Sequence, residues 1–271
     1  MPKYSQNFLT NPAVAEKIAS ACVPDPEDIV VEIGPGRGFL TGFLIKLYPG
    51  RMIAVEIDPA MVRSLKAKFE GAHLRVVEED FLKTDLEQLC GGKRAVLAGN
   101  LPYDVASPIL QKVLGWKNFH RAIFMFQKEV AERITAVPGS RDYGVLTLAV
   151  RSRADVTMLL GVDKSNFQPV PKVDSAVLIF RRRSEVFFSL PEDERNFFAA
   201  VKAAFAHRRK TILNSMSSAT DISKENLKAA LESAGIDPAL RAEAVAMESY
   251  LALSRRVPAA FHGQPFGIIQ K

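Results

Sequence analysis

The chain has 271 residues, of which 48% are hydrophobic and 24% are charged, a balance typical of a globular protein with a sizeable core. No apolar run reaches the roughly 18 residues that a membrane span requires, and the first residues lack the apolar stretch of a signal peptide. The cysteines are Cys22 and Cys90, too few for a disulfide framework and without histidines at metal spacing. We therefore expect no zinc site and a reducing, cytoplasmic location.

The formal net charge is +6 and the pI is near 9.3, which favours a polyanionic partner because basic residues release counterions from phosphate. A solvated surface with a slight lysine excess would explain the total equally well. Residues 151–183 hold seven Lys or Arg against three Asp or Glu, and a second basic cluster consists of Arg208, Arg209 and Lys210. We predict that this second cluster contacts phosphate; the alternative is a solvated helix face.

Short apolar runs alternate with helical patterns over the first 143 residues. The runs predict strands at 29–33, 52–57, 74–77, 94–98 and 122–126. Helices are predicted to start at Asn11-Pro12, with proline at the first helical position, and to span 39–47, 59–69, 105–114 and 127–136. This alternation predicts an α/β fold, with a mostly parallel sheet and helices on both of its faces.

The pattern changes after Tyr143. A helix is predicted over 144–153 and strands over 156–160 and 175–180, with a proline-marked loop between the strands at 167–171. Strand signals stop after Arg183, and helices are predicted over 192–206, 208–217, 224–234 and 246–254. We therefore expect two domains, an α/β domain over 1–184 and a small all-α domain over 185–271.

A glycine-rich turn follows the first predicted long strand. Gly34, Gly36 and Gly38 lie between that strand and a helix, a position where backbone can approach a ligand closely. The dinucleotide pattern G-x-G-x-x-G fails because Phe39 occupies the place of its third glycine. The G-x-G-x-G spacing instead resembles the S-adenosylmethionine loop of class I methyltransferases, whereas the simpler alternative is a tight turn without a ligand.

Two acidic residues follow the next two strands. Glu56 stands at the end of the second strand, where its carboxylate can accept hydrogen bonds from both ribose hydroxyls of a nucleoside cofactor. Asp80 comes just after the third strand and can accept from the adenine amino group. Acids at strand ends are common, but three consecutive strands ending in a glycine turn, a Glu and an Asp make coincidence a poor explanation.

The tetrapeptide Asn100-Leu101-Pro102-Tyr103 follows the fourth strand and resembles the [DNS]-P-P-[YF] signature of amino-methyltransferases. An exocyclic adenine N6 is a poor nucleophile because its lone pair is delocalised into the ring. The Asn100 side-chain oxygen and the Leu101 carbonyl can accept hydrogen bonds from its two N–H groups and free that lone pair. Pro102 stiffens the loop, and Tyr103 offers a face on which the base can stack. The alternative is a plain β-turn.

Phe167 lies in the proline-marked loop and is a candidate for the opposite face of the target base. The alternative is a core phenylalanine beneath the loop. We therefore include Phe167, with the tetrapeptide, among the candidate catalytic residues.

With these residues in view, the chain resembles the ribosomal RNA adenine N6,N6-dimethyltransferases over nearly its whole length. The matching segments are 6–9, 31–41, 100–103, 126–130, 167–175 and 204–211, with Asn214. The resemblance implies S-adenosylmethionine as the cofactor, no metal, and a class I methyltransferase fold. It also implies cofactor contacts at Asn7, Leu9, Gly34, Glu56, Asp80 and Asn100.

Two branches of this family compete: one acts on small-subunit RNA during ribosome assembly, and the other acts on large-subunit RNA and confers macrolide resistance. The P-G-R-G turn at 35–38, the F-Q-K-E-V segment at 126–130 and the R-R-K-T-I-x-N segment at 208–214 are similar to the first branch. That branch implies dimethylation of two adjacent adenines in an RNA hairpin loop, by a monomer on a partly assembled subunit. One departure is Glu79, where many relatives have glycine before the aspartate. A DNA adenine methyltransferase and an assembly factor that acts mainly by binding remain alternatives.

Overall fold

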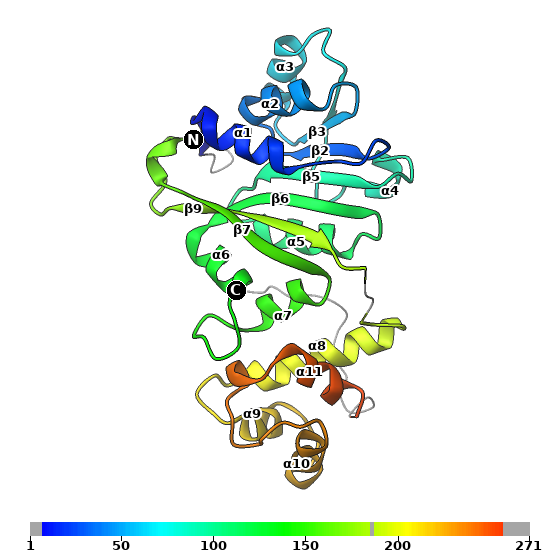
Figure 1. Ribbon diagram of the computed structural model, residues 1–271, viewed down its shortest axis with the longest axis vertical. Coiled ribbons are helices and arrows are strands. Elements are labelled where there is room, and N and C mark those ends of the chain that lie inside the picture. The colour runs from blue at the N-terminus through cyan, green and yellow to red at the C-terminus, as the bar shows by residue number, and fades with distance from the viewer. Residues whose placement is uncertain (1–6, 185–186, 257–271) are drawn as a thin grey trace. The chain divides into compact units, whose positions relative to one another are not determined.

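The protein is described here by a computed structural model that covers residues 7–184 and 187–256 (Figure 1). Its described residues form two compact units. The first contains 7–131 and 154–182, and the second contains 132–153 and 183–256. Apart from a two-residue shift of the boundary near 183, the expected division at 184/185 differs from these units in segment 132–153, which joins the helical unit. The reason is packing: Tyr143, Leu148 and Ala149 are buried in the core of that unit.

Within the described residues, seven strands of the first unit form one sheet in the order β4-β3-β2-β5-β6-β9-β7. Its strands are β2 (Ile29–Ile33), β3 (Met52–Glu56), β4 (Leu74–Glu78), β5 (Ala95–Asn100), β6 (Phe119–Gln127), β7 (Ala154–Val162) and β9 (Ser175–Arg182). β2 to β6 run parallel to one another, and β9 is antiparallel to both β6 and β7. The sheet is therefore mostly parallel, as predicted.

Helices follow most of the parallel strands, as the ribbon in Figure 1 shows. These helices are α2 (Phe39–Leu47), α3 (Pro59–Lys68), α4 (Leu86–Leu89), α5 (Ala106–Gly115) and α6 (Lys128–Thr135), and α1 (Pro12–Ala21) precedes β2. The start of α1 is capped as the sequence predicts, because the Asn11 side chain accepts a hydrogen bond from the Ala13 N–H and proline follows at the first turn. The four-residue helix α4 was not predicted, since a single turn carries no apolar periodicity.

A second, two-stranded sheet was also missed. β1 (Phe8–Leu9) pairs antiparallel with β8 (Phe167–Gln168). Strands of two residues leave no alternation in the sequence, and their partners are far apart along the chain. This pairing ties the N-terminal segment to the proline-marked loop.

The second unit packs helices around an apolar core that includes Phe197, Val201, Leu231 and Tyr250. Its helices are α7 (Val145–Arg151), α8 (Pro191–Phe205), α9 (Ile212–Ala219), α10 (Lys224–Ser233) and α11 (Met247–Ser254). The helix predicted over 208–217 begins four residues later than expected. Thr211 is its N-cap and accepts from the Asn214 N–H, so the basic residues before it lie in a turn.

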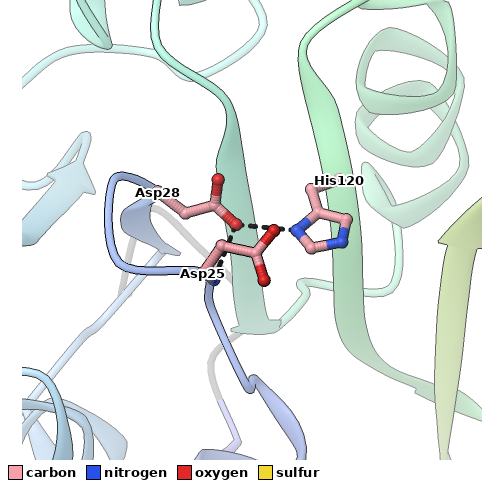
Figure 2. A group of neighbouring side chains, drawn as sticks. All are labelled: Asp25, Asp28 and His120. Atoms are coloured by element: carbon pink, nitrogen blue, oxygen red, sulfur yellow. Dashed lines mark hydrogen bonds and ion pairs between the residues drawn. The ribbon is translucent and has the colours of Figure 1, made fainter.

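An ion-pair network lies where β2 and β6 begin, at the amino ends of the parallel strands (Figure 2). The Asp28 side chain is 1% exposed and accepts hydrogen bonds from the Asp25 N–H at 2.9 Å, Arg94 Nε at 3.2 Å and His120 Nδ1 at 2.7 Å. Arg94 also pairs with the Asp25 carboxylate. The residue types resemble a metal site, but protein donors already engage both Asp28 oxygens, so we interpret the cluster as structural.

Burial acts to raise the pKa of Asp28, but the hydrogen bonds from His120 and the Asp25 N–H, with the charge of Arg94, hold that pKa below its usual value. A lowered pKa in the folded state means that ionisation stabilises the fold above the unfolded pKa. That contribution is lost as the pH falls through the folded value.

Asp28→Asn should therefore lower the free energy of unfolding by about 1.5–3 kcal/mol near neutral pH, because it removes the charge from a buried, hydrogen-bonded acceptor. Urea denaturation near pH 7 and near pH 3 measures this difference, which should shrink in acid. Binding of the S-adenosylmethionine that the family resemblance implies should not change, because the network lies at the amino ends of the strands. Equal stability of the variant and the wild type at neutral pH would contradict the assignment.

Candidate active site

A cavity of about 470 Å³ opens at the carboxyl ends of the parallel strands. Four neighbouring strands each deliver a predicted residue to its lining, because parallel strands end at the same edge of a sheet. These residues are Gly34 after β2, Glu56 at the end of β3, Asp80 after β4 and Asn100 at the end of β5. The structure thus brings together the four features that the sequence placed on separate strands.

The glycine turn has backbone geometry that other residues rarely adopt. Gly36 and Gly38 have φ values of +53° and +71°. A Cβ on Gly36 would lie 2.9 Å from the Phe8 ring, and one on Gly38 would lie 2.7 Å from the side chains of Leu65 and Phe69. Lys68, which also lines the cavity, holds the turn, since its ammonium donates to the Arg37 and Gly38 carbonyls at 2.9 and 3.3 Å. The turn therefore presents bare backbone to the cavity.

Glu56 is 3% exposed and is held by backbone donors. Its Oε2 accepts from the Gly36 N–H at 3.0 Å, and its Oε1 accepts from the N–H groups of Ile57 and Asp58 at 2.9 and 3.0 Å. These bonds connect the end of β3 directly to the glycine turn. Each carboxylate oxygen has more than one acceptor site, so Glu56 can still accept from hydroxyl groups in the cavity.

Asp80 starts a compact turn after β4. Its Oδ1 accepts from the Leu82 N–H at 2.9 Å, and its carbonyl accepts from the N–H groups of Lys83 and Thr84. Phe81 is 5% exposed and also lines the cavity, which gives this end of the cavity one apolar ring beside one carboxylate. Glu79, the departure from the family pattern, leaves the Asp80 carboxylate at the cavity.

The orientation of the Asn100 amide is set by a distant part of the chain. Its Nδ2 donates to the Asn7 carbonyl at 2.9 Å, so Oδ1 points the other way and is the acceptor available to a ligand. Asn7 and Leu9 line the same cavity, on either side of Phe8. The Phe8 ring packs against Gly36 and lies 4.3 Å from the Arg37 guanidinium, which docks the N-terminal segment on the glycine turn.

The rest of the tetrapeptide also lines the cavity. Leu101 is 1% exposed, and Pro102 and Tyr103 are partly exposed. The Tyr103 hydroxyl lies 3.0 Å from the hydroxyl of Ser175, which is buried at the start of β9. This contact fixes the phenol end of the ring, and the ring itself borders the cavity.

Phe167 is the predicted site residue that the structure does not bring to the cavity. Its side chain is 2% exposed and packs in the apolar core with Leu9, Ile18 and Val177. Its neighbour Gln168 lines the cavity instead. In this conformation the core alternative is correct for Phe167, because pairing of β8 with β1 turns the ring inward.

Glu32 was missed by the sequence reasoning. It lies on β2 two residues before the glycine turn, is 2% exposed and lines the cavity, and its Oε2 has no hydrogen-bond partner among the described residues. Burial raises the pKa of Glu32 to about 8, and the nearby charge of Glu56 acts in the same direction. The signal that could have found it is an acid inside an otherwise apolar strand run.

The basic residues Arg208, Arg209 and Lys210 belong to the second unit and are exposed in the turn before α9. An Arg208 nitrogen donates to the Arg141 carbonyl of the same unit. Their exposure is compatible with phosphate contacts and equally with a solvated surface.

The sheet is mostly parallel, and its carboxyl edge carries a glycine turn, Glu56 in the position of a ribose-binding carboxylate, Asp80 and the N-L-P-Y loop. This combination defines a class I S-adenosylmethionine-dependent methyltransferase. The family model described as ribosomal RNA adenine dimethylase matches residues 1–258. The chain belongs to this family and is an S-adenosylmethionine-dependent ribosomal RNA methyltransferase.

Individual relatives agree with the family match. The chain is 44% identical over 258 residues to ribosomal RNA small subunit methyltransferase A of Myxococcus xanthus, covering 93% of this chain and 90% of that protein. It is 40% identical over 253 residues to the protein of the same name from Desulfitobacterium hafniense, with the same coverage.

Two solved structures are similar over almost the whole chain. A dimethyladenosine transferase from Plasmodium falciparum has a TM-score of 0.78 and 28% identity, covering 94% of this chain and 99% of that one. The 23S rRNA methyltransferase ErmE has a TM-score of 0.72 and 29% identity, covering 92% and 99%. No helix in the described part of the chain has the length and apolar character needed to cross a membrane.

The raised pKa of Glu32 predicts a pH-dependent cost to stability. Between its ordinary value of 4.5 and about 8, the unfolded chain carries an ionised Glu32 and the folded protein a protonated one. Stability therefore falls as the pH rises through this window. Glu32→Gln lacks this cost and should melt at a higher temperature than the wild type above about pH 8, with a difference that vanishes toward about pH 4.5. Melting curves of the ligand-free proteins across this range measure it; parallel curves with no pH-dependent gap would exclude a raised pKa.

Proposed function

We propose that this protein transfers methyl groups to the N6 amino groups of two adjacent adenines in a hairpin loop of small-subunit ribosomal RNA, dimethylating each. The observation that carries the proposal is the Asn100 amide, oriented by the Asn7 carbonyl with its oxygen available beside the glycine-turn cavity. The names of the relatives at 40–44% identity support a small-subunit target. The ErmE structure, similar at 29% identity, is the reason to test a large-subunit target as well.

The cavity has the chemical character that S-adenosylmethionine requires. The cofactor supplies an electrophilic methyl group on a sulfonium when bound. We assign the bare glycine turn with Gly34 and Gly36 to its amino-acid part. A buried Glu32 oxygen that no described residue engages is an acceptor there for an ammonium group. Glu56 is assigned to the ribose hydroxyls and Asp80 to the adenine amino group.

The Asn100 Oδ1 and the Leu101 carbonyl are the two acceptors for the N–H groups of the target adenine. As N6 loses planarity, its N–H groups become more acidic, so these hydrogen bonds strengthen toward the transition state. Pro102 adds no N–H that would compete, and the Tyr103 ring provides a stacking face worth about 1–3 kcal/mol per base. No general base is required before transfer, because the nitrogen becomes acidic once it is alkylated.

Phe167 enters this proposal only if its side chain leaves the core on RNA binding, since the described conformation buries it.

We assign most of the acceleration of methyl transfer to the alignment of the target amino group with the methyl donor, for which about 7–11 kcal/mol is available in well-oriented systems.

We assign the all-α part of the chain to RNA recognition, through Arg208, Arg209 and Lys210. All three side chains are exposed in one turn. The proposed partner is a partly assembled small subunit in the cytoplasm, bound by a monomer of this protein. A role in assembly through binding alone is the second candidate, and a variant that binds RNA but does not methylate it distinguishes the two.

Asn100→Ala should keep the fold and RNA affinity but lose about 10²–10³ in methyl-transfer rate, the usual cost of one preorganised transition-state donor or acceptor. Asn100→Asp is the sharper probe. It replaces the donor Nδ2 with an oxygen that faces the Asn7 carbonyl, so the side chain loses its anchor even though an acceptor is retained. Both variants should therefore be slow.

Single-turnover rates at saturating cofactor and RNA measure this, with cofactor affinity determined separately by calorimetry. Small- and large-subunit RNA serve as parallel substrates, read by mass spectrometry of the modified adenines. If Asn100→Ala reacts within about threefold of the wild type, the tetrapeptide is a structural turn and the proposed mechanism is wrong.

Replacing Arg208, Arg209 and Lys210 together by alanine should flatten the dependence of log K on log salt for RNA binding. The expected change is about two slope units, at ~0.7 per phosphate contact on single strands. Filter binding over a salt series measures the slope, and S-adenosylmethionine affinity is the control that should not move. An unaltered slope would show that the cluster is only a solvated surface.

A further inference from the structure

Lys112 lies in the last turn of α5, the helix that follows the catalytic tetrapeptide. Its ammonium donates to the Leu82 carbonyl at 2.9 Å and to the Thr84 carbonyl at 2.5 Å. The side chain is half-buried, and Nζ lies 5.8 Å from the centre of the Phe81 ring. Lys112 therefore spans from α5 to the turn after β4.

That turn, residues 80–84, is neither helix nor strand. Four of its internal hydrogen bonds reach Asp80: the Lys83 and Thr84 N–H groups and the Thr84 hydroxyl donate to the Asp80 carbonyl, and the Leu82 N–H donates to Oδ1. The Thr84 N–H also donates to the Phe81 carbonyl at 3.3 Å. These bonds do not use the carbonyls of Leu82 and Thr84. Both of those carbonyls are bound by Lys112, which closes the turn from the side of α5.

The surrounding charges favour this arrangement. Burial lowers the pKa of Lys112, while the carboxylates of Glu79, Asp80 and Asp85 act to raise it. The ammonium thus supplies a positive charge to a turn rich in carboxylates, and its two hydrogen bonds are of the stronger, charge-assisted kind.

Lys112 is absent from the residues that line the cavity in the described part of the chain, whereas Asp80, Phe81 and Leu82 are all present there. We propose that Lys112 is a positioning residue for cofactor binding, which holds the 80–84 turn in the geometry that the adenine end of S-adenosylmethionine requires. This rests on the assignment of Asp80 to the adenine amino group.

The test compares Lys112→Met, which keeps an apolar stem and removes the donors, with Lys112→Arg, which restores donors. Lys17→Met is the matched control, because Lys17 is an exposed lysine within helix α1. Calorimetry with S-adenosylhomocysteine should show affinity about tenfold or more weaker for Lys112→Met, largely recovered in Lys112→Arg and unchanged in Lys17→Met. The kcat at saturating cofactor should stay within about threefold of wild type, so the loss appears in KM for the cofactor.

A double-mutant cycle with Asp80→Asn separates positioning from general destabilisation. The losses of cofactor-binding free energy in the two single variants should be markedly less than additive, because both substitutions act on the same contact to the cofactor's adenine. Hydrogen exchange should speed up in residues 80–85 of Lys112→Met and remain unchanged in β2 and β5. If Lys112→Met does not fold, Lys112→Gln takes its place in the same measurements.

Wild-type cofactor affinity in Lys112→Met, full additivity with Asp80→Asn, or faster exchange throughout the sheet would each overturn the proposal. A different result, normal cofactor affinity in Asp80→Asn itself, would instead overturn the assignment of Asp80 on which the proposal rests.

Discussion

The parallel register of four strands is the constraint on which the site depends. Glu32 on β2 lies opposite Ala54 of β3 and Ala98 of β5, so the last residues of these strands reach the same edge together. Glu56 of β3 is in turn paired with Glu78 of β4, directly before the turn that carries Asp80. A one-residue slip in any of these pairings would move the polar groups to the opposite face of the sheet. Burial of nearly every side chain in β2, β3 and β5 holds the register, because slippage would expose apolar surface on both faces.

The strand register brings the polar side chains to the carboxyl edge of the sheet. Hydrogen bonds from segments distant in the chain then orient these side chains. Glu56 is held by the Gly36 N–H, the Asn100 amide by the Asn7 carbonyl, and the turn of Asp80 by Lys112. In each case an irregular segment is fixed by a partner on another element. Preorganisation of this kind is what makes a hydrogen bond effective in the transition state, since little rearrangement is needed when charge develops.

The same cavity carries an energetic cost. The Glu32 carboxyl is buried at its base with an oxygen that no described residue engages, and burial raises its pKa to about 8. A core optimised for stability alone would place an apolar residue here, because an unpaired buried polar group is destabilising. At the other edge of the sheet Asp28 is equally buried, but Arg94, His120 and a backbone N–H engage it and hold its pKa below the usual value. Glu32 is thus a buried acid with an oxygen available to a ligand, whereas Asp28 is a buried acid that stabilises the fold.

The seven strands of the main sheet, most of the helices, the glycine turn, the strand-end acids and the N-L-P-Y loop were predictable from the sequence by itself, because hydrophobic periodicity and turn residues are local signals. The resemblance in those motifs was enough to predict the methyltransferase family. Tertiary structure alone decided that Phe167 is buried, since that depends on its pairing with Leu9, 158 positions away in the chain, and on a shared core. It also decided that 132–153 joins the helical unit and that Lys112 closes the turn of Asp80. These outcomes rest on contacts between residues far apart in the chain, and neither spacing nor composition encodes which distant partners meet when the core closes.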